Sequence, residues 1–80
     1  MYSFAHNVFM NKKELFAARF KDLIKEKGTS LYQIEKTTGL LHGTLSRYAN
    51  ALNAPQLEQI WILAEYFGCT IDYLLGRTDY

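Results

Sequence analysis

Residues 30–50, SLYQIEKTTGLLHGTLSRYAN, constrain the fold of this chain more than any other stretch. Ser30 can cap a helix, because its hydroxyl can accept a hydrogen bond from a free backbone N–H one turn on. Gly39 suits the left-handed turn that ends a helix. Apolar residues recur with helical spacing on both sides of Gly39: Leu31, Ile34 and Thr38 before it, and Leu41, Leu45, Tyr48 and Leu52 after it. The stretch therefore predicts two short helices joined by a tight turn.

Two helices of about two turns, joined by about four residues around a glycine, are typical of the helix-turn-helix motif. The second helix of the pair carries a polar face opposite its apolar stripe. That face consists of His42, Gly43, Ser46, Arg47 and Asn50. These side chains are suited to hydrogen bonding rather than to burial, so the face is a candidate recognition surface.

The rest of the sequence predicts one small all-α domain. The chain has 80 residues, of which 49% are apolar, and no segment alternates in the manner of a strand. Five helices are expected, over residues 12–27, 31–37, 42–50 and 55–67 and in a short segment after Thr70. The expected apolar stripes are Phe16, Phe20, Leu23 and Ile24 in the first helix, Leu57, Ile60 or Trp61, Ala64 and Phe67 in the fourth, and Ile71, Leu74 and Leu75 in the fifth.

Composition argues against an enzyme, a metal site or a membrane protein. Cys69 is the only cysteine, and it is expected to be a small buried apolar group. His6 and His42 are far apart in sequence, and no carboxylate pair or phosphate-binding loop is present. We therefore predict no catalysis, no cofactor and no metal. No apolar run is long enough to span a membrane, and residues 1–10 do not resemble a signal peptide, so a cytoplasmic location is expected.

Charge is distributed unevenly, although the net charge is only +1. Through Asn50 there are eight basic and four acidic residues, a net charge of +4, whereas the remainder carries −3. A positive half that contains the helix-turn-helix is consistent with a phosphate-facing surface.

The segment TLSRYAN, followed by a helix and then by TIDYLLGRTD, resembles the lambda-repressor-like (Xre-type) family of phage and prophage repressors. The similarity covers roughly residues 12–79. It implies a compact five-helix lambda-repressor-like DNA-binding domain, in which the second and third helices form the helix-turn-helix. In such proteins the third helix enters the major groove of DNA.

The resemblance also implies which residues contact double-stranded DNA. The expected base-contacting residues are Leu41, His42, Gly43, Ser46 and Arg47. The expected phosphate-contacting residues are Ser30, Leu31, Tyr32, Thr44, Asn50 and Asn53. Arg47 is the strongest of these candidates, because a guanidinium group can bond to both O6 and N7 of guanine.

Several positions depart from the family pattern, and four of them bear on stability. Leu41 stands where many relatives have a capping Ser or Thr, and Gly43 stands where they have a side chain; each change costs about 1 kcal/mol of helix stability. Gly43 either loosens the first turn of the helix or allows the backbone to approach DNA closely. Ile24 and Ala49 occupy the positions of a buried Arg–Glu pair in several phage repressors, and we predict that they pack together instead.

Two regions suggest protein contacts. Residues 1–11, MYSFAHNVFMN, form an extension to the domain of residues 12–80, and their aromatic groups either form a loose leader or dock on the domain or on a second subunit. Ile62 and Tyr66 are expected to point away from the core, with Tyr73 nearby, as a dimer contact.

The leading functional prediction is a sequence-specific transcriptional repressor that binds a near-palindromic operator as a homodimer. The alternative is a protein-interaction module with the same fold. Such a module would be antitoxin-like and would bind a toxin or a phage antirepressor.

Overall fold

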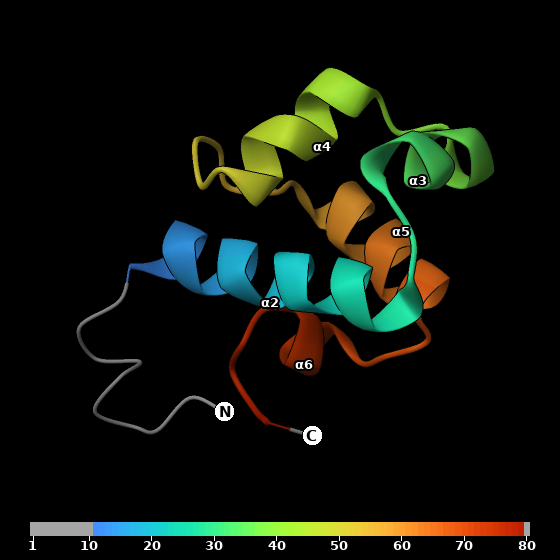
Figure 1. The fold of residues 1–80 in the computed structure, drawn as a ribbon. Coiled ribbons are helices and arrows are strands. Elements are labelled where there is room, and N and C mark those ends of the chain that lie inside the picture. Colours follow the sequence, from blue (N-terminus) through green and yellow to red (C-terminus); the bar gives the residue numbers. More distant parts are fainter. Residues whose placement is uncertain (1–10, 80) are drawn as a thin grey trace.

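The structure is a computed structural model that describes residues 11–79. Within this range it contains five α-helices and no strand (Figure 1). The helices are α2 (Lys12–Lys27), α3 (Leu31–Thr38), α4 (His42–Ala49), α5 (Leu57–Phe67) and α6 (Ile71–Leu74). The predicted all-α, five-helix architecture is confirmed.

Helix ends follow local sequence signals. The side-chain oxygens of Ser30 and Thr70 accept hydrogen bonds from backbone N–H groups at the starts of α3 and α6, as predicted. Gly39 ends α3 in the left-handed conformation, with φ 82° and ψ 0°. Because residues with a Cβ atom rarely adopt this conformation, glycine fixes the helix end at this position.

Three predicted boundaries differ by one or two residues. Helix α3 ends at Thr38 rather than at Thr37. Helix α4 ends at Ala49 rather than at Asn50, because Ala51 takes a positive φ of 58° and reverses the chain. Helix α5 begins at Leu57 rather than at Pro55, with Gln56 as its cap residue in extended conformation.

The core is built around α2, which lies between α3 and α4 on one side and α6 on the other (Figure 1). Phe16 and Phe20 stack with their ring centroids 5.6 Å apart, and the ring of Tyr48 on α4 meets Phe16 edge-on at 5.9 Å. The other fully buried large side chains come from the remaining helices: Ile34, Leu45, Leu63 and Leu74. Contacts with α2 thereby fix the position of α4 relative to the rest of the domain.

Several predicted core residues are instead exposed. Leu41 and Leu52 are 67% and 64% exposed, because they lie beyond the two ends of α4 and no longer follow its helical stripe. On α5 the inward stripe is Ile60, Leu63, Ala64 and Phe67. Leu57 and Trp61 lie outside this stripe, at 69% and 56% exposure, and Leu63 is the buried residue that the sequence prediction missed.

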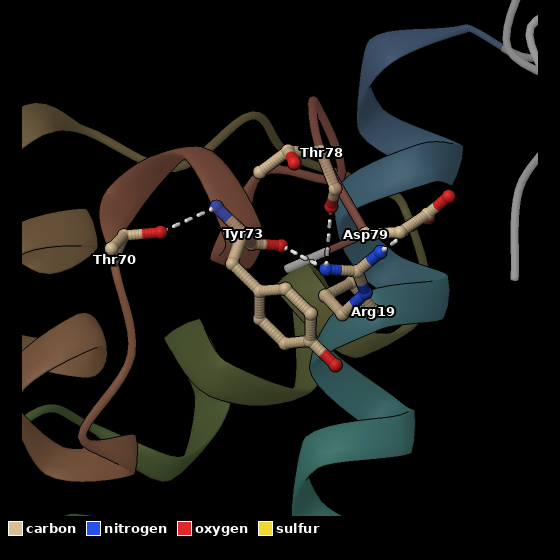
Figure 2. Close-up of polar contacts among 5 residues, drawn as sticks. All are labelled: Arg19, Thr70, Tyr73, Thr78 and Asp79. Carbon is tan, nitrogen blue, oxygen red and sulfur yellow. Dashed lines mark hydrogen bonds and ion pairs between the residues drawn. The ribbon is translucent and has the colours of Figure 1, made fainter.

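Arg19 of α2 is buried, with only 4% of its surface exposed, and it anchors the end of the chain (Figure 2). Its guanidinium donates to the carbonyl oxygens of Tyr73 and Thr78, the latter at 3.2 Å, and pairs with the Asp79 carboxylate at 3.6 Å. The same group lies 3.8 Å from the centroid of the Tyr73 ring. We refer to Arg19, Tyr73, Thr78 and Asp79 as the Arg19 cluster. Sequence reasoning treated Arg19 only as a surface charge and missed this role.

The segment TIDYLLGRTD, residues 70–79, has a structural role, to which the Arg19 cluster and its neighbours contribute. Thr70 caps α6, Leu74 enters the core, and Gly76 lets the chain pass close to α2. A Cβ atom on Gly76 would lie 2.7 Å from Cγ of Leu15, and its φ of 80° also disfavours other residues. The segment therefore closes the core beneath α2 rather than contributing to the recognition surface.

Cys69, between α5 and α6, is half-buried and packs against the core. Burial raises the pKa of the Cys69 thiol, and the positive charge of Arg19 opposes this with a smaller lowering effect. Because the thiolate is the reactive form, a raised pKa keeps the thiol protonated at pH 7 and slows its alkylation. We expect iodoacetamide to modify native Cys69 several-fold more slowly than the unfolded protein at pH 7, with the native rate rising only at higher pH than for the unfolded chain. Mass spectrometry of timed samples measures both rates, and equal rates would contradict this expectation.

Candidate nucleic-acid interface

The turn between α3 and α4 is held by hydrogen bonds from the end of α3. The backbone N–H of Gly39 donates to the carbonyl of Glu35 at 2.8 Å. The Thr38 hydroxyl donates to the Ile34 carbonyl at 2.7 Å and accepts from the backbone N–H of Leu40 at 3.2 Å. With Ile34 and Leu45 fully buried on the two helices, the angle between α3 and α4 is fixed both by the turn and by the core.

Helix α4 has one buried and one exposed face, as predicted. Leu45 and Tyr48 point into the core. Of the predicted base-contacting residues, Leu41, His42, Gly43 and Arg47 are exposed, while Ser46 is half-buried. These residues form one continuous surface along α4 and its N-cap, which we call the α4 face.

The N-terminus of α3 lies next to the turn, and its side chains differ in availability. The Ser30 hydroxyl accepts a hydrogen bond from the Gln33 N–H at 3.2 Å, so it already serves as the helix cap. Leu31 is half-buried against the core, whereas Tyr32 is 59% exposed. The ammonium group of Lys36 lies 5.4 Å from the centroid of the Tyr32 ring, so a cation and the Tyr32 side chain lie next to each other on this surface.

Asn50 and Asn53 flank the end of α4. The Asn50 side-chain amide donates to the Ser46 carbonyl at 2.9 Å, so it stabilises the helix end. The same amide nitrogen also lies 3.4 Å from the Ser46 hydroxyl oxygen, to which it donates a longer hydrogen bond. Asn53 is exposed in the loop before α5, and Thr44 is half-buried on α4.

The structure reduces the positive charge available at the surface. Arg19 is buried and paired with Asp79, so it contributes little to the field around the helix-turn-helix half. In residues 11–50, seven basic residues are exposed, and the acidic residues are three exposed ones and the half-buried Glu35; without Arg19 the net charge is +3 rather than the +4 counted from the sequence. The ion pair with Arg19 also neutralises Asp79, which belongs to the negatively charged half of the chain. The first half therefore stays positive and the second half stays negative.

Tyr66 and Tyr73 are half-buried and pack against the core, although Tyr66 was expected to point away from it, and a dimer contact through Ile62, Tyr66 and Tyr73 stays a prediction. The Tyr66 hydroxyl hydrogen-bonds to the Thr29 hydroxyl at 2.6 Å and its ring packs on the core, while Tyr73 lies under Arg19. Both rings are thus held by polar partners within the domain, which the sequence spacing did not reveal. Ile62 instead joins the exposed side chains of Leu57 and Trp61 around a shallow groove on α5.

Three further expectations have different outcomes. Ile24 and Ala49 both pack against the core cluster, and a direct contact between them stays a prediction. Residues 1–10, with the proposed docking of their aromatic groups, lie outside the described residues. Among residues 11–79, no helix is long and apolar enough to cross a membrane, and no three potential metal-ligating side chains come together.

A central α2 helix whose inward side chains build the core, a fixed α3–turn–α4 unit and an exposed α4 face define the class of helix-turn-helix DNA-binding domains. Residues 20–74 match the model of the helix-turn-helix family, and the chain belongs to this family of DNA-binding transcriptional regulators. The chain is 36% identical over 59 residues to the HTH-type transcriptional regulator AnsR of Bacillus subtilis (strain 168). It is 26% identical over 65 residues to the uncharacterized HTH-type transcriptional regulator YobD of the same organism.

These alignments cover 74% and 81% of this chain but only 51% and 58% of the two relatives. The chain therefore spans about half the length of the curated relatives that it matches. No solved structure matches the chain.

Gly43 offers a test of how the first turn of α4 works. No atom lies within 4 Å of a Cβ built on Gly43, and the Leu41 side chain makes no capping hydrogen bond. Gly43→Ala is therefore expected to raise the free energy of unfolding by about 1 kcal/mol, because alanine is the better helix former. Urea denaturation measures the change. A lower free energy of unfolding for Gly43→Ala would contradict the expectation that alanine fits into the open space at this position.

The same variant separates the two roles considered for Gly43. Tighter or unchanged DNA binding would show that the glycine merely loosens the helix. A loss of binding despite higher stability would show that the backbone approaches DNA closely at this position.

Proposed function

We propose that this protein is a sequence-specific transcriptional repressor that acts in the cytoplasm by occupying promoter DNA. It binds a near-palindromic operator as a homodimer, with α4 of each subunit in a major groove. The exposed α4 face, above all Arg47, is the observation that carries this proposal. Arg47 and His42 supply the hydrogen-bonding groups that can distinguish bases, while Leu45 and Tyr48 anchor the helix from behind.

The proposed phosphate contacts surround the α4 face. They come from the N-terminus of α3, where Ser30, Leu31 and Tyr32 lie, and from Thr44, Asn50 and Asn53. Backbone N–H groups at a helix N-terminus favour an anion, and the α3 start has no acidic side chain in its first turn. Lys36 adds a cation to this side of the domain.

The proposed dimer contact is the apolar surface of α5, formed by the exposed Leu57 and Trp61 and the half-buried Ile62. Trp61 is more than half exposed, and aromatic side chains are enriched at protein interfaces. In a two-fold dimer on B-DNA, the two α4 helices would lie one helical turn apart, about 34 Å. Tyr66 and Tyr73 act only indirectly in this arrangement, by holding α5 and α6 in place.

A second candidate function uses the same α5 surface for a different partner, such as a toxin or an antirepressor. The exposure of Leu57 and Trp61 supports this reading equally well. The two functions differ in what the isolated protein does with DNA, since a pure interaction module has no sequence preference.

Selection of bound duplexes from a random library tests the proposed function. The expected result is one enriched motif with two-fold symmetry and half-sites about ten base pairs apart. Affinity for the selected duplex should fall steeply as the salt concentration rises, because phosphate contacts release counterions. A library without any enriched motif would contradict the repressor and favour the interaction module.

A further inference from the structure

A cavity of about 440 Å³ opens beside the first turn of α2. We call it the α2 groove. Its apolar walls come from three parts of the chain that are distant in sequence: Leu15 and Phe16, Pro55 and Ile60, and Leu75. The volume lies within the range of small-ligand sites, so the groove can accept one or two large apolar side chains. It is not part of the α4 face.

The chain enters α2 directly beside this groove. Asn11 and Glu14 form a reciprocal capping box: the Asn11 side chain accepts from the Glu14 N–H at 2.8 Å, and the Glu14 carboxylate accepts from the Asn11 N–H at 3.3 Å. An apolar residue just before such a box commonly packs on the fourth residue of the helix. Here these two positions are Met10 and Leu15, and Leu15 is a wall of the groove.

We propose that residues 4–10 fold back in the same molecule and place the side chains of Phe9 and Met10 in the α2 groove. The segment ends where the groove begins, so a turn at Asn11 suffices to bring it there. Six of the ten residues before Asn11 are large and apolar: Met1, Tyr2, Phe4, Val8, Phe9 and Met10. The segment of residues 4–10 has no Asp, Glu, Lys or Arg, and His6 is its only titratable side chain, which suits an apolar lining.

The rim of the groove carries Lys12, Lys13 and Arg77, and such a rim also suits an amphiphile with an acidic head. The tethered segment has the advantage over such a molecule, because a short tether gives an effective concentration in the millimolar range. The basic side chains can stay hydrated when a neutral segment binds. Their methylene groups can cover the segment while their charged ends remain in water. Arg77 also has a partner in Asp72, at 3.7 Å.

Methyl-selective NMR of the full chain tests this proposal. Met1 and Met10 are the only methionines, so labelled methionine gives two methyl signals, and Met1 serves as the internal reference. We expect nuclear Overhauser effects (NOEs) from the Met10 methyl group to the methyl groups of Leu15, Ile60 and Leu75, together with a ring-current shift from Phe16. A Met10 signal without these effects would overturn the proposal.

Mixed samples of labelled and unlabelled protein identify the occupant. Contacts seen only between different molecules would overturn docking within one chain in favour of exchange between two copies. Contacts from the groove to a co-purified small molecule would overturn it in favour of a bound amphiphile.

Thermal unfolding provides a second measurement. Phe9→Ser is expected to lower the melting temperature by roughly 5 °C, because it removes an apolar group from the groove. His6→Ser, a change at a polar position in the same segment, should leave the melting temperature unchanged. Equal effects of the two substitutions would overturn the proposal.

Discussion

Replacing Arg19 with methionine is expected to lower the free energy of unfolding by about 3 kcal/mol. The buried guanidinium donates to the Tyr73 and Thr78 carbonyl oxygens, and methionine fills a similar volume without any donor. Buried hydrogen bonds to a charged group contribute about 1.5–3 kcal/mol each, and the Tyr73 carbonyl oxygen keeps the hydrogen bond that it accepts from the Gly76 N–H. In the Arg19→Met variant, residues 76–79 can detach and let water reach the carbonyl oxygens. This local opening would limit the loss of unfolding free energy to about 3 kcal/mol.

Asp79→Asn is the matched control for the Arg19 cluster. The Asp79 side chain is 29% exposed, so its ion pair with Arg19 is partly screened by solvent. We expect a loss of under about 1 kcal/mol for this substitution. Urea denaturation of both variants gives the comparison, and equal losses would contradict the view that the carbonyl contacts dominate. Hydrogen exchange should show faster opening at the C-terminal end of the Arg19→Met variant than in α4.

The helix-turn-helix could be predicted from sequence because its signals are local. Ser30 caps the helix that begins one residue later, and Gly39 ends it, so both boundaries of α3 depend on neighbours in sequence. The two faces of α4 likewise follow from spacing alone, since Leu45 and Tyr48 are buried whichever partner they meet. The same reasoning correctly predicted that Arg47 would be exposed.

Predictions that depended on distant contacts were weaker. Arg19 donates to carbonyls 54 and 59 residues away in sequence, and nothing near Arg19 indicates them. On α5 almost every position is apolar, so spacing alone did not distinguish the buried Leu63 from the exposed Trp61. Tyr66 was misassigned for a related reason, because its partner, the Thr29 hydroxyl, lies beyond the end of α2.

Replacing Arg47 with alanine is expected to weaken binding to the selected operator by about 5- to 150-fold per recognition helix. This range corresponds to the 1–3 kcal/mol by which one bidentate contact discriminates the right base from a wrong one. Binding to unrelated DNA should fall much less, since it loses only one cation. The specificity ratio, measured by titrating operator and scrambled duplexes at the same salt concentration, should therefore shrink.

Two further variants separate the shape of the Arg47 side chain from its charge. Arg47→Lys keeps the positive charge but loses the planar pair of donors, so it should retain binding to unrelated DNA and still lose preference for guanine. Arg77→Ala removes a charge of the same kind from an exposed position after α6, which lies on the opposite side of α2 from α3 and α4 (Figure 1). It should leave the operator preference intact. If Arg47→Lys keeps the full specificity ratio, or Arg77→Ala reduces it as much as Arg47→Ala does, the side chain at position 47 acts as a general cation rather than as a reader of bases.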